Sequence, residues 1–167
     1  ANLVSRYESL SEFQSIQNNF SLLNRRFFDE LSTVCLNEKV SLLPYSPLGG
    51  GVLSGKYQNN KFPPNTRFKE YMQDGSSRQK KMAQRFVNDA TLASTAKYLG
   101  IAAEVGISPV TLATAWSMHW DFVASTIIGV RSVDQLPDIF AAFEVTLGEE
   151  MIKLCDEVHK KHPYPMG

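Results

Sequence analysis

Apolar and polar residues recur along the first part of the chain with periods that predict helices and strands in turn. Residues 1–10 resemble the end of a helix, and residues 13–20 alternate as in a strand. Asn24 is the expected N-cap of a helix over 25–37, and the apolar run at 40–45 predicts a buried strand. This order of elements favours parallel strand pairing and the α/β class.

The remainder of the chain is predicted to be mainly helical. Residues 58–80 are rich in Asn, Pro, Gln, Lys and Ser, which predicts a long irregular loop of the kind that covers a ligand. The elements expected after it are a helix over 82–105, a helix opened by Ser108 and Pro109, a third strand over 125–130, a helix capped by Ser132 and a last helix over about 148–162.

Composition describes an ordinary globular chain. Its 167 residues suit one domain, with 43% hydrophobic and 20% charged residues. Seventeen basic residues balance seventeen acidic ones, so we expect neither a nucleic-acid nor a membrane partner. Cys35 and Cys155 lie outside any C-x-x-C or Cys/His spacing, which predicts packed, reduced thiols in a reducing compartment.

The chain's start shows neither a secretory signal nor an initiator Met, and no apolar run approaches the roughly twenty residues of a membrane span. We therefore expect a processed or partial chain. The cytoplasm is the expected location, with an organelle as the open alternative.

The stretch 40–57, VSLLPYSPLGGGVLSGKY, concentrates the candidate chemistry. An apolar run leads into Gly49–Gly51, where backbone N–H groups could approach a ligand closely, and Ser54 and Lys56 follow. These groups suit an anion such as phosphate, and the alternative is a tight strand exit with nothing bound. A nucleotide-hydrolase P-loop is rejected, because Tyr57 stands where that loop needs a Ser or Thr for magnesium.

A second candidate junction lies at 129–135, where a predicted strand leads directly into a helix. Free N–H groups at such a helix start favour anions, and Arg131 beside it would suit an extra phosphate. The two junctions could therefore hold the two ends of one dinucleotide. Arg67, in the sequence PPNTRF, is either a cation placed over this site or a solvated surface charge.

Five motifs identify a resemblance that covers essentially the whole chain. They are IQNNFSLLNR at 16–25, YSPLGGGVLSGKY at 45–57, PPNTR at 63–67, ISPVTLATAW at 107–116 and STIIGVRSVDQL at 125–136. In this order they resemble the aldo-keto reductase superfamily, in the branch with bacterial and plant oxidoreductases and potassium-channel β-subunits. The resemblance implies a (β/α)8 TIM barrel with NADPH across the C-terminal ends of its strands. It further implies that 1–167 is the C-terminal, cofactor-binding part, about strands six to eight with their helices, of an incomplete barrel.

The resemblance also assigns cofactor-binding residues by their place in the motifs. Gln17 matches the residue that holds the nicotinamide carboxamide, and Tyr45 the aromatic that stacks on the nicotinamide ring. The other matches are Ser46, Pro47, Leu48, Gly50, Ser54 and Lys56 at the pyrophosphate turn, Arg67 over it, and Gly129, Arg131, Gln135 and Asp138 at the adenosine end.

Two departures from the family pattern concern the adenosine end. Relatives often carry Ser or Thr where this chain has Arg131, which strengthens the expected preference for NADPH over NADH. Where relatives place Glu-Asn to hold adenine, this chain has Asp138 and Ile139, so Asp138 is carried over weakly and Ile139 is not.

The family's catalytic Tyr, Lys, Asp and His belong to its first half, so no catalytic residue is assigned here. His119, His159 and His162 are expected to be surface or packing residues, and no metal site is predicted. The chain is therefore predicted to be the cofactor-binding half of an NADPH-dependent reductase of aldehydes and ketones, inactive alone. Its expected partners are a small carbonyl substrate and either the missing N-terminal half or another copy of itself.

Two alternatives come from other functional classes. One is a non-enzymatic NADP(H)-binding module that senses redox state, as the resemblance to channel β-subunits suggests. The other is a truncated assembly partner that binds no nucleotide.

Overall fold

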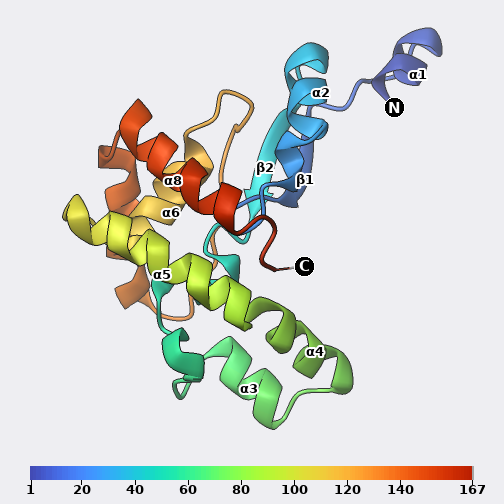
Figure 1. The fold of residues 1–167 in the computed structure, drawn as a ribbon. Coiled ribbons are helices and arrows are strands. Elements are labelled where there is room, and N and C mark those ends of the chain that lie inside the picture. Colours follow the sequence, from blue (N-terminus) through green and yellow to red (C-terminus); the bar gives the residue numbers. More distant parts are fainter. Residues whose placement is uncertain (167) are drawn as a thin grey trace.

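The computed structural model describes residues 1–166, which form a short parallel sheet flanked by helices (Figure 1). Strand β1 (Ser15–Asn19) pairs with β2 (Ser41–Tyr45), with Gln17 opposite Leu43. The predicted parallel pairing and α/β class are therefore confirmed. The helices are α1 (Asn2–Tyr7), α2 (Leu31–Glu38), α3 (Arg67–Gln73), α4 (Ser77–Phe86), α5 (Asp89–Glu104), α6 (Pro109–Met118), α7 (Leu136–Phe140) and α8 (Glu149–Lys161).

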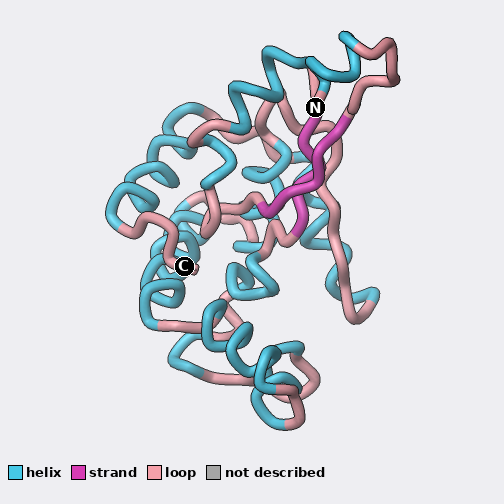
Figure 2. The backbone as a smooth tube through the Cα atoms, turned by 90° about the vertical axis from the view of Figure 1, so that its right-hand side faces the viewer, coloured by secondary structure: helices cyan, strands magenta, loops and turns pink. Residues whose placement is uncertain are grey.

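The two faces of this small sheet differ in burial. Leu42 and Pro44 of β2 are buried, whereas Tyr45 at the end of the same strand is exposed. Successive side chains of a strand point to opposite faces, so Gln17 and Tyr45 share the more open face. Figure 2 shows the two strands side by side, with helices making up most of the rest of the chain.

The third strand predicted at 125–130 is not formed as a regular strand. Instead, segment 122–127 lies alongside β2 and is joined to it by two isolated parallel bridges, at Val123 and Ile127. Backbone hydrogen bonds hold it there, including Ile127 N–H to the Pro44 carbonyl at 2.7 Å. The segment begins with a tight turn in which Val123 N–H bonds to the Trp120 carbonyl.

The single helix predicted over 82–105 is two helices, α4 and α5. Asn88 between them forms a capping box with Thr91, in which each side chain accepts the other residue's backbone N–H, at 3.0 and 3.1 Å. Such a reciprocal cap starts a new helix, so the chain changes direction at Val87 and Asn88. Apolar periodicity alone does not indicate that α4 and α5 are separate helices.

The irregular loop predicted over 58–80 is also wrong, since α3 and the start of α4 lie within it. Ser76 and Gln79 form a second capping box that begins α4, a pattern that polar composition conceals. Phe68 of α3 is buried against Tyr57 and Phe86, with ring centroids 5.3 Å apart in both pairs. This aromatic contact fixes α3 to the rest of the protein.

The helix predicted over 25–37 begins later than expected. A 3-10 turn (Arg26–Phe28) comes first, and α2 starts at Leu31 rather than after the expected cap, Asn24. Phe27 and Phe28 both pack on the Phe20 ring, at 6.0 and 5.1 Å. Tertiary packing therefore outweighs local helix propensity in this segment.

Two later helix predictions are confirmed. Helix α6 has Pro109 in its first turn and Ser108 as N-cap, whose hydroxyl accepts the Thr111 N–H at 3.1 Å. Helix α8 follows Gly148 as predicted. Ser132, however, makes no side-chain capping bond, and the helix expected after it is divided into a 3-10 turn (Val133–Gln135), α7 and a second 3-10 turn (Ala141–Glu144).

An aromatic cluster forms much of the core beside the sheet. Phe20, Phe27 and Trp116 are fully buried and contact Phe28 and Phe122. Both cysteines are free and buried, as predicted. Burial raises the pKa of the Cys155 thiol to about 11, which keeps it protonated and unreactive at neutral pH.

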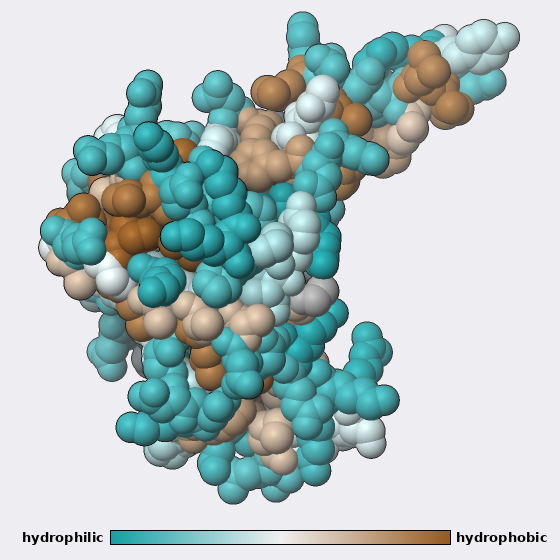
Figure 3. Space-filling model, viewed as in Figure 1, coloured by the Kyte–Doolittle hydropathy of each residue, from teal (hydrophilic) through white to brown (hydrophobic). Residues whose placement is uncertain are grey.

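Helix α1 projects away from the rest of the molecule, at the end opposite α3 and α4 (Figure 1). Its apolar residues Leu3 and Val4 are exposed, and brown side chains are visible on this projection in Figure 3. Within residues 1–166, no single helix is long and apolar enough to cross a membrane. Only α5 and α6 together meet that length and composition, and they are bent by 97° at their junction.

Candidate functional site

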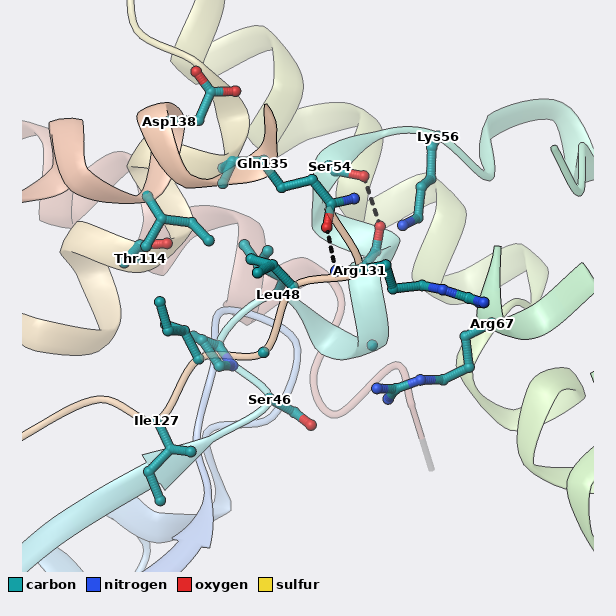
Figure 4. Close-up of a pocket in the computed structure, with 18 of the residues that line it drawn as sticks. Ser46, Leu48, Ser54, Lys56, Arg67, Thr114, Ile127, Arg131, Gln135 and Asp138 are labelled. Carbon is teal, nitrogen blue, oxygen red and sulfur yellow. Dashed lines mark hydrogen bonds between the residues drawn. The ribbon is translucent and has the colours of Figure 1, made fainter. Parts of the chain in front are cut away.

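A cavity of about 430 Å³ lies beyond the carboxyl end of β2 (Figure 4). Its walls come from the glycine-rich 3-10 turn (Gly49–Ser54), the start of α3, the inner side of α6 and the segment 127–139. The volume falls within the range of roughly 300–1,000 Å³ that is common for small-molecule sites. The cavity therefore gathers four separate parts of the chain around one space.

The glycines of the turn are required by geometry at two positions. Gly50 has φ +66°, and a Cβ added there would lie 2.7 Å from the ring of Phe68. Gly51 has φ +95°, and its Cβ would lie 2.8 Å from Lys56 Nζ. A side chain at Gly51 would therefore occupy the space that the lysine ammonium uses beside the cavity.

Backbone strain marks the point where β2 enters this turn. Ser46 has φ +57°, a left-handed conformation that residues other than glycine adopt infrequently. Its carbonyl accepts the Gly49 N–H at 2.9 Å, and the Ser54 hydroxyl donates to the Gly51 carbonyl at 2.8 Å. These bonds hold the turn in a compact form that leaves its outer surface against the cavity.

Three cations gather at one end of the cavity. Figure 4 shows Lys56, Arg67 and Arg131 at this end, with Thr114 and Asp138 at the other. Burial and the charges of Arg131 and Arg67 lower the pKa of Lys56 below its ordinary value. Burial is the largest cause of this shift, and repulsion from the two guanidinium groups adds to it.

One carboxylate outside the cavity lining, Glu70, pairs with one of these cations, and Asp134 and Asp138 line the cavity itself. Glu70 of α3 accepts a 2.5 Å hydrogen bond from Arg131 Nη2, and this bond lowers the pKa of Glu70. We refer to Lys56, Arg67, Arg131 and Glu70 as the charged end of the cavity. An anion with two or more charges would balance it, as a dinucleotide pyrophosphate or a phosphomonoester would.

Gln135 has a structural role at the second junction. Its Oε1 accepts the Arg131 N–H at 2.9 Å, so one of the N–H groups expected to face an anion is already bonded. The following 3-10 turn has only three residues, and α7 only five. The charge at this junction therefore comes from the Arg131 side chain rather than from a long helix dipole.

All the predicted cofactor-binding residues except Gln17 line this one cavity. Those brought together are Tyr45, Ser46, Pro47, Leu48, Gly50, Ser54, Lys56, Arg67, Gly129, Arg131, Gln135 and Asp138. Gln17 does not line it, although it lies on the same open face of the sheet as Tyr45 and closer to the start of the strands.

Several lining residues were not predicted from the sequence. Val110 and Thr114 of α6 belong to the apolar side of the cavity, together with Ile127 and Ile128. Thr114 is 1% exposed, and its buried hydroxyl has no partner in the part of the chain that the structure describes. Val110 and Thr114 are one helical turn apart, a spacing that could have indicated a shared surface on α6.

A smaller cavity of about 280 Å³ has a separate set of lining residues. Arg25, Asp156 and His159 line it together with Trp120 and Tyr164. Burial, and then the Arg25 charge, lower the pKa of His159. Arg25 pairs with Asp156 and Tyr164 with Asp29, so this region is assigned a structural role.

Comparison with known proteins gives the class to which this α/β chain and its cation-lined cavity belong. A sequence model of the Aldo/keto reductase family matches residues 2–160. The chain is 35% identical over 159 residues to the protein tas of Escherichia coli, covering 93% of this chain and 42% of that protein. It therefore belongs to the aldo/keto reductase family.

Two further similarities extend this result. A probable voltage-gated potassium channel subunit beta of Oryza sativa is 29% identical over 164 residues, which is 97% of this chain and 43% of that protein. The structure of a glycerol dehydrogenase from Gluconobacter oxydans matches with a TM-score of 0.70 at 18% identity, over 96% of this chain and 46% of that one. The chain thus spans less than half the length of these relatives.

Proposed function

We propose that this chain is the cofactor-binding part of an NADPH-dependent aldo-keto reductase that reduces aldehydes or ketones to alcohols. The observation that carries the proposal is the charged end of the cavity, where Lys56, Arg67 and Arg131 line one space and Arg131 is paired with Glu70. Membership of the aldo/keto reductase family supports a nicotinamide dinucleotide as the ligand.

The residues of the cavity fit such a ligand by their chemistry. Lys56 and Arg67 would bind the pyrophosphate beside the glycine turn, and Arg131 would bind the adenosine 2′-phosphate. Apolar side chains at Val110 and Ile139 would contact the adenine. A side chain larger than glycine at position 51 would displace the Lys56 ammonium, so this turn suits a close approach of phosphate.

Tyr45 would face the nicotinamide end. It is 39% exposed at the mouth of the cavity and shares a sheet face with Gln17, which would bind the carboxamide. When bound, the nicotinamide supplies the hydride for reduction of a carbonyl. The chain's own residues would orient that ring and hold the charged part of the cofactor.

The chain alone is proposed to lack reductase activity. Reduction of a carbonyl needs a proton donor beside the hydride source, and Tyr45 is the only titratable hydroxyl or imidazole group on the cavity lining in the described residues. Its proposed role is stacking on the nicotinamide. NADPH-dependent turnover of an aldehyde by the purified chain, free of any longer form, would contradict this part of the proposal.

A second candidate function is redox sensing without turnover. The match to the rice channel subunit, which extends over 97% of this chain, favours it. In that case the same cavity would hold NADP(H) tightly, and the bound nucleotide rather than a product would be the output. Slow exchange of the nucleotide, with no turnover of any carbonyl by the complete protein, distinguishes this function from the first.

The test is calorimetric titration of the purified protein with NADPH at low salt. Lys56→Met is expected to weaken binding by roughly tenfold, because it removes a half-buried cation that faces the ligand phosphates. Lys61→Met is the matched control, since Lys61 is exposed and does not line the cavity. Absence of NADPH binding by the unmodified protein, or equal losses in the two variants, would contradict the proposal.

A further inference from the structure

The ion pair between Glu70 and Arg131 joins two walls of the cavity that lie 61 residues apart in the sequence. Glu70 belongs to α3, which Phe68 anchors to the core, and Arg131 belongs to the turn before α7. The Nη2–Oε1 distance is 2.5 Å. The pair therefore links α3 to the adenosine side of the proposed cofactor site.

Each partner remains accessible to solvent. The Arg131 and Glu70 side chains are 47% and 51% exposed. Within residues 1–166, Glu70 is the only side chain bonded to the Arg131 guanidinium. A guanidinium has five N–H donors, so Arg131 retains donors for a further acceptor. An ion pair of this exposure contributes on the order of 0–1 kcal/mol, and a ligand could therefore displace it.

The surroundings of the pair favour an anion over the carboxylate that is present. Arg131 also acts electrostatically on Lys56, whose pKa it helps to lower, so the Glu70 charge leaves part of the local positive charge unbalanced. A phosphomonoester carries up to two negative charges near neutral pH and three acceptor oxygens, compared with one charge and two oxygens for Glu70. It would bind the Arg131 guanidinium more strongly than Glu70 does, at the cost of breaking this pair.

We infer that Glu70 is a specificity-determining residue, which competes with the 2′-phosphate of NADPH for Arg131 and so narrows the preference for NADPH over NADH. The inference rests on the proposed function and deepens it. NADH has a ribose hydroxyl where NADPH has the phosphate, and a carboxylate accepts a hydrogen bond from such a hydroxyl in many dinucleotide sites. The Glu70 carboxylate would repel the 2′-phosphate of NADPH and accept a hydrogen bond from the ribose hydroxyl of NADH. The Arg131 guanidinium would instead attract the phosphate.

The test measures dissociation constants for NADPH and NADH with the purified protein and its Glu70→Gln variant. The amide keeps the size of the side chain and removes its charge. The variant is expected to bind NADPH about two- to fivefold more tightly, which corresponds to the energy of one exposed ion pair. Its NADH affinity is expected to stay equal or decrease, so that the ratio of the two constants shifts toward NADPH.

Two further variants distinguish competition between Glu70 and the 2′-phosphate from a non-specific effect of charge on nucleotide affinity. Asp74→Asn removes a charge at the C-terminal end of the same helix, away from the cavity lining, and should leave both constants unchanged. In an Arg131→Gln background, Glu70→Gln should no longer tighten NADPH binding, because the competed guanidinium is gone. A gain in NADPH affinity from Glu70→Gln that is lost in the Arg131→Gln background is the result that competition predicts.

Three results would contradict the inference. Weaker NADPH binding by Glu70→Gln would mean that Glu70 positions Arg131 for the ligand rather than competing with it. Equal gains in the presence and absence of Arg131 would mean a non-specific charge effect. Binding of neither dinucleotide by the unmodified protein would overturn the proposed function itself and with it this inference, whereas binding of both with an unchanged ratio would overturn the inference alone.

Discussion

Arg25 and the three cations of the charged end, Lys56, Arg67 and Arg131, differ in how their charges are balanced. Arg25 is 4% exposed, and its guanidinium donates to Asp156 at 2.6 Å and to the Cys155 carbonyl at 2.9 Å. It also lies 4.5 Å from the centre of the Trp116 ring. Two of the three guanidinium nitrogens are therefore bonded within the fold, while Arg25 Nε is buried without a partner among the described residues.

The charged end of the cavity is balanced incompletely. Glu70 pairs with Arg131, and burial together with the charges of Arg131 and Arg67 lowers the pKa of Lys56. A cation whose charge is paired within the fold contributes to stability, whereas a group of cations with an unbalanced charge is available to a ligand. The contrast explains why Arg25 is interpreted as structural and the second set as a binding site.

Removal of Arg25 is expected to have the largest effect on stability among the changes that test this comparison. Arg25→Met should lower the free energy of unfolding by about 3 kcal/mol, because Asp156 and the Cys155 carbonyl lose their buried donor. Lys56→Met should change it by less than about 0.5 kcal/mol, since a partly buried, repelled ammonium contributes little to stability. Urea denaturation followed by circular dichroism measures both, and equal losses would remove the distinction.

A smaller effect is expected from the acidic partner of Arg25. Asp156 is 42% exposed, so Asp156→Asn leaves an amide oxygen that still accepts from Arg25. The expected loss is about 1 kcal/mol, which is the difference between a charge-assisted and a neutral hydrogen bond. NADPH affinity should not change, because Asp156 lies outside the cavity lining. A change in affinity as large as that of Lys56→Met would show that the two regions are coupled.

The smallest expected effect is a dependence of binding on pH. The free protein loses the Lys56 proton below the ordinary lysine value of 10.5, and a bound phosphate would favour the protonated form. The complex therefore binds more protons than the free protein, so NADPH affinity should decrease as pH rises above the lowered pKa of Lys56. We expect a decrease of less than about tenfold between pH 7 and 9.5. Lys56→Arg should remove it, and a flat profile for the unmodified protein would contradict the assignment.

Local sequence signals predicted the two strands, the glycine turn, the cap of α6 and the extent of α8 well, because each depends on residues close together in the chain. The break at Asn88 and the start of α4 at Ser76 both carry capping boxes, but neither follows from composition or apolar periodicity. The strand predicted at 125–130 is reduced to one isolated bridge, at Ile127, and apolar periodicity does not describe how a segment pairs.

Long-range partners could not be predicted at all. Arg25 and Asp156 lie 131 residues apart, and no motif around either residue indicates that they form a pair. The same holds for Glu70 and Arg131, which meet only because α3 forms where a loop was expected. The motifs predicted which residues would surround the cavity, but Glu70 and Thr114 became visible only from the packing of α3 and α6.

We propose that the cavity beyond β2 binds a nicotinamide dinucleotide with its phosphates at the charged end. A crystal structure of the protein grown with NADP⁺ is the decisive experiment. We expect pyrophosphate density against Lys56 and Arg67, the 2′-phosphate on Arg131 in place of Glu70, and the nicotinamide ring on Tyr45. A dinucleotide bound elsewhere, or bound here with its phosphates away from these cations, would contradict it.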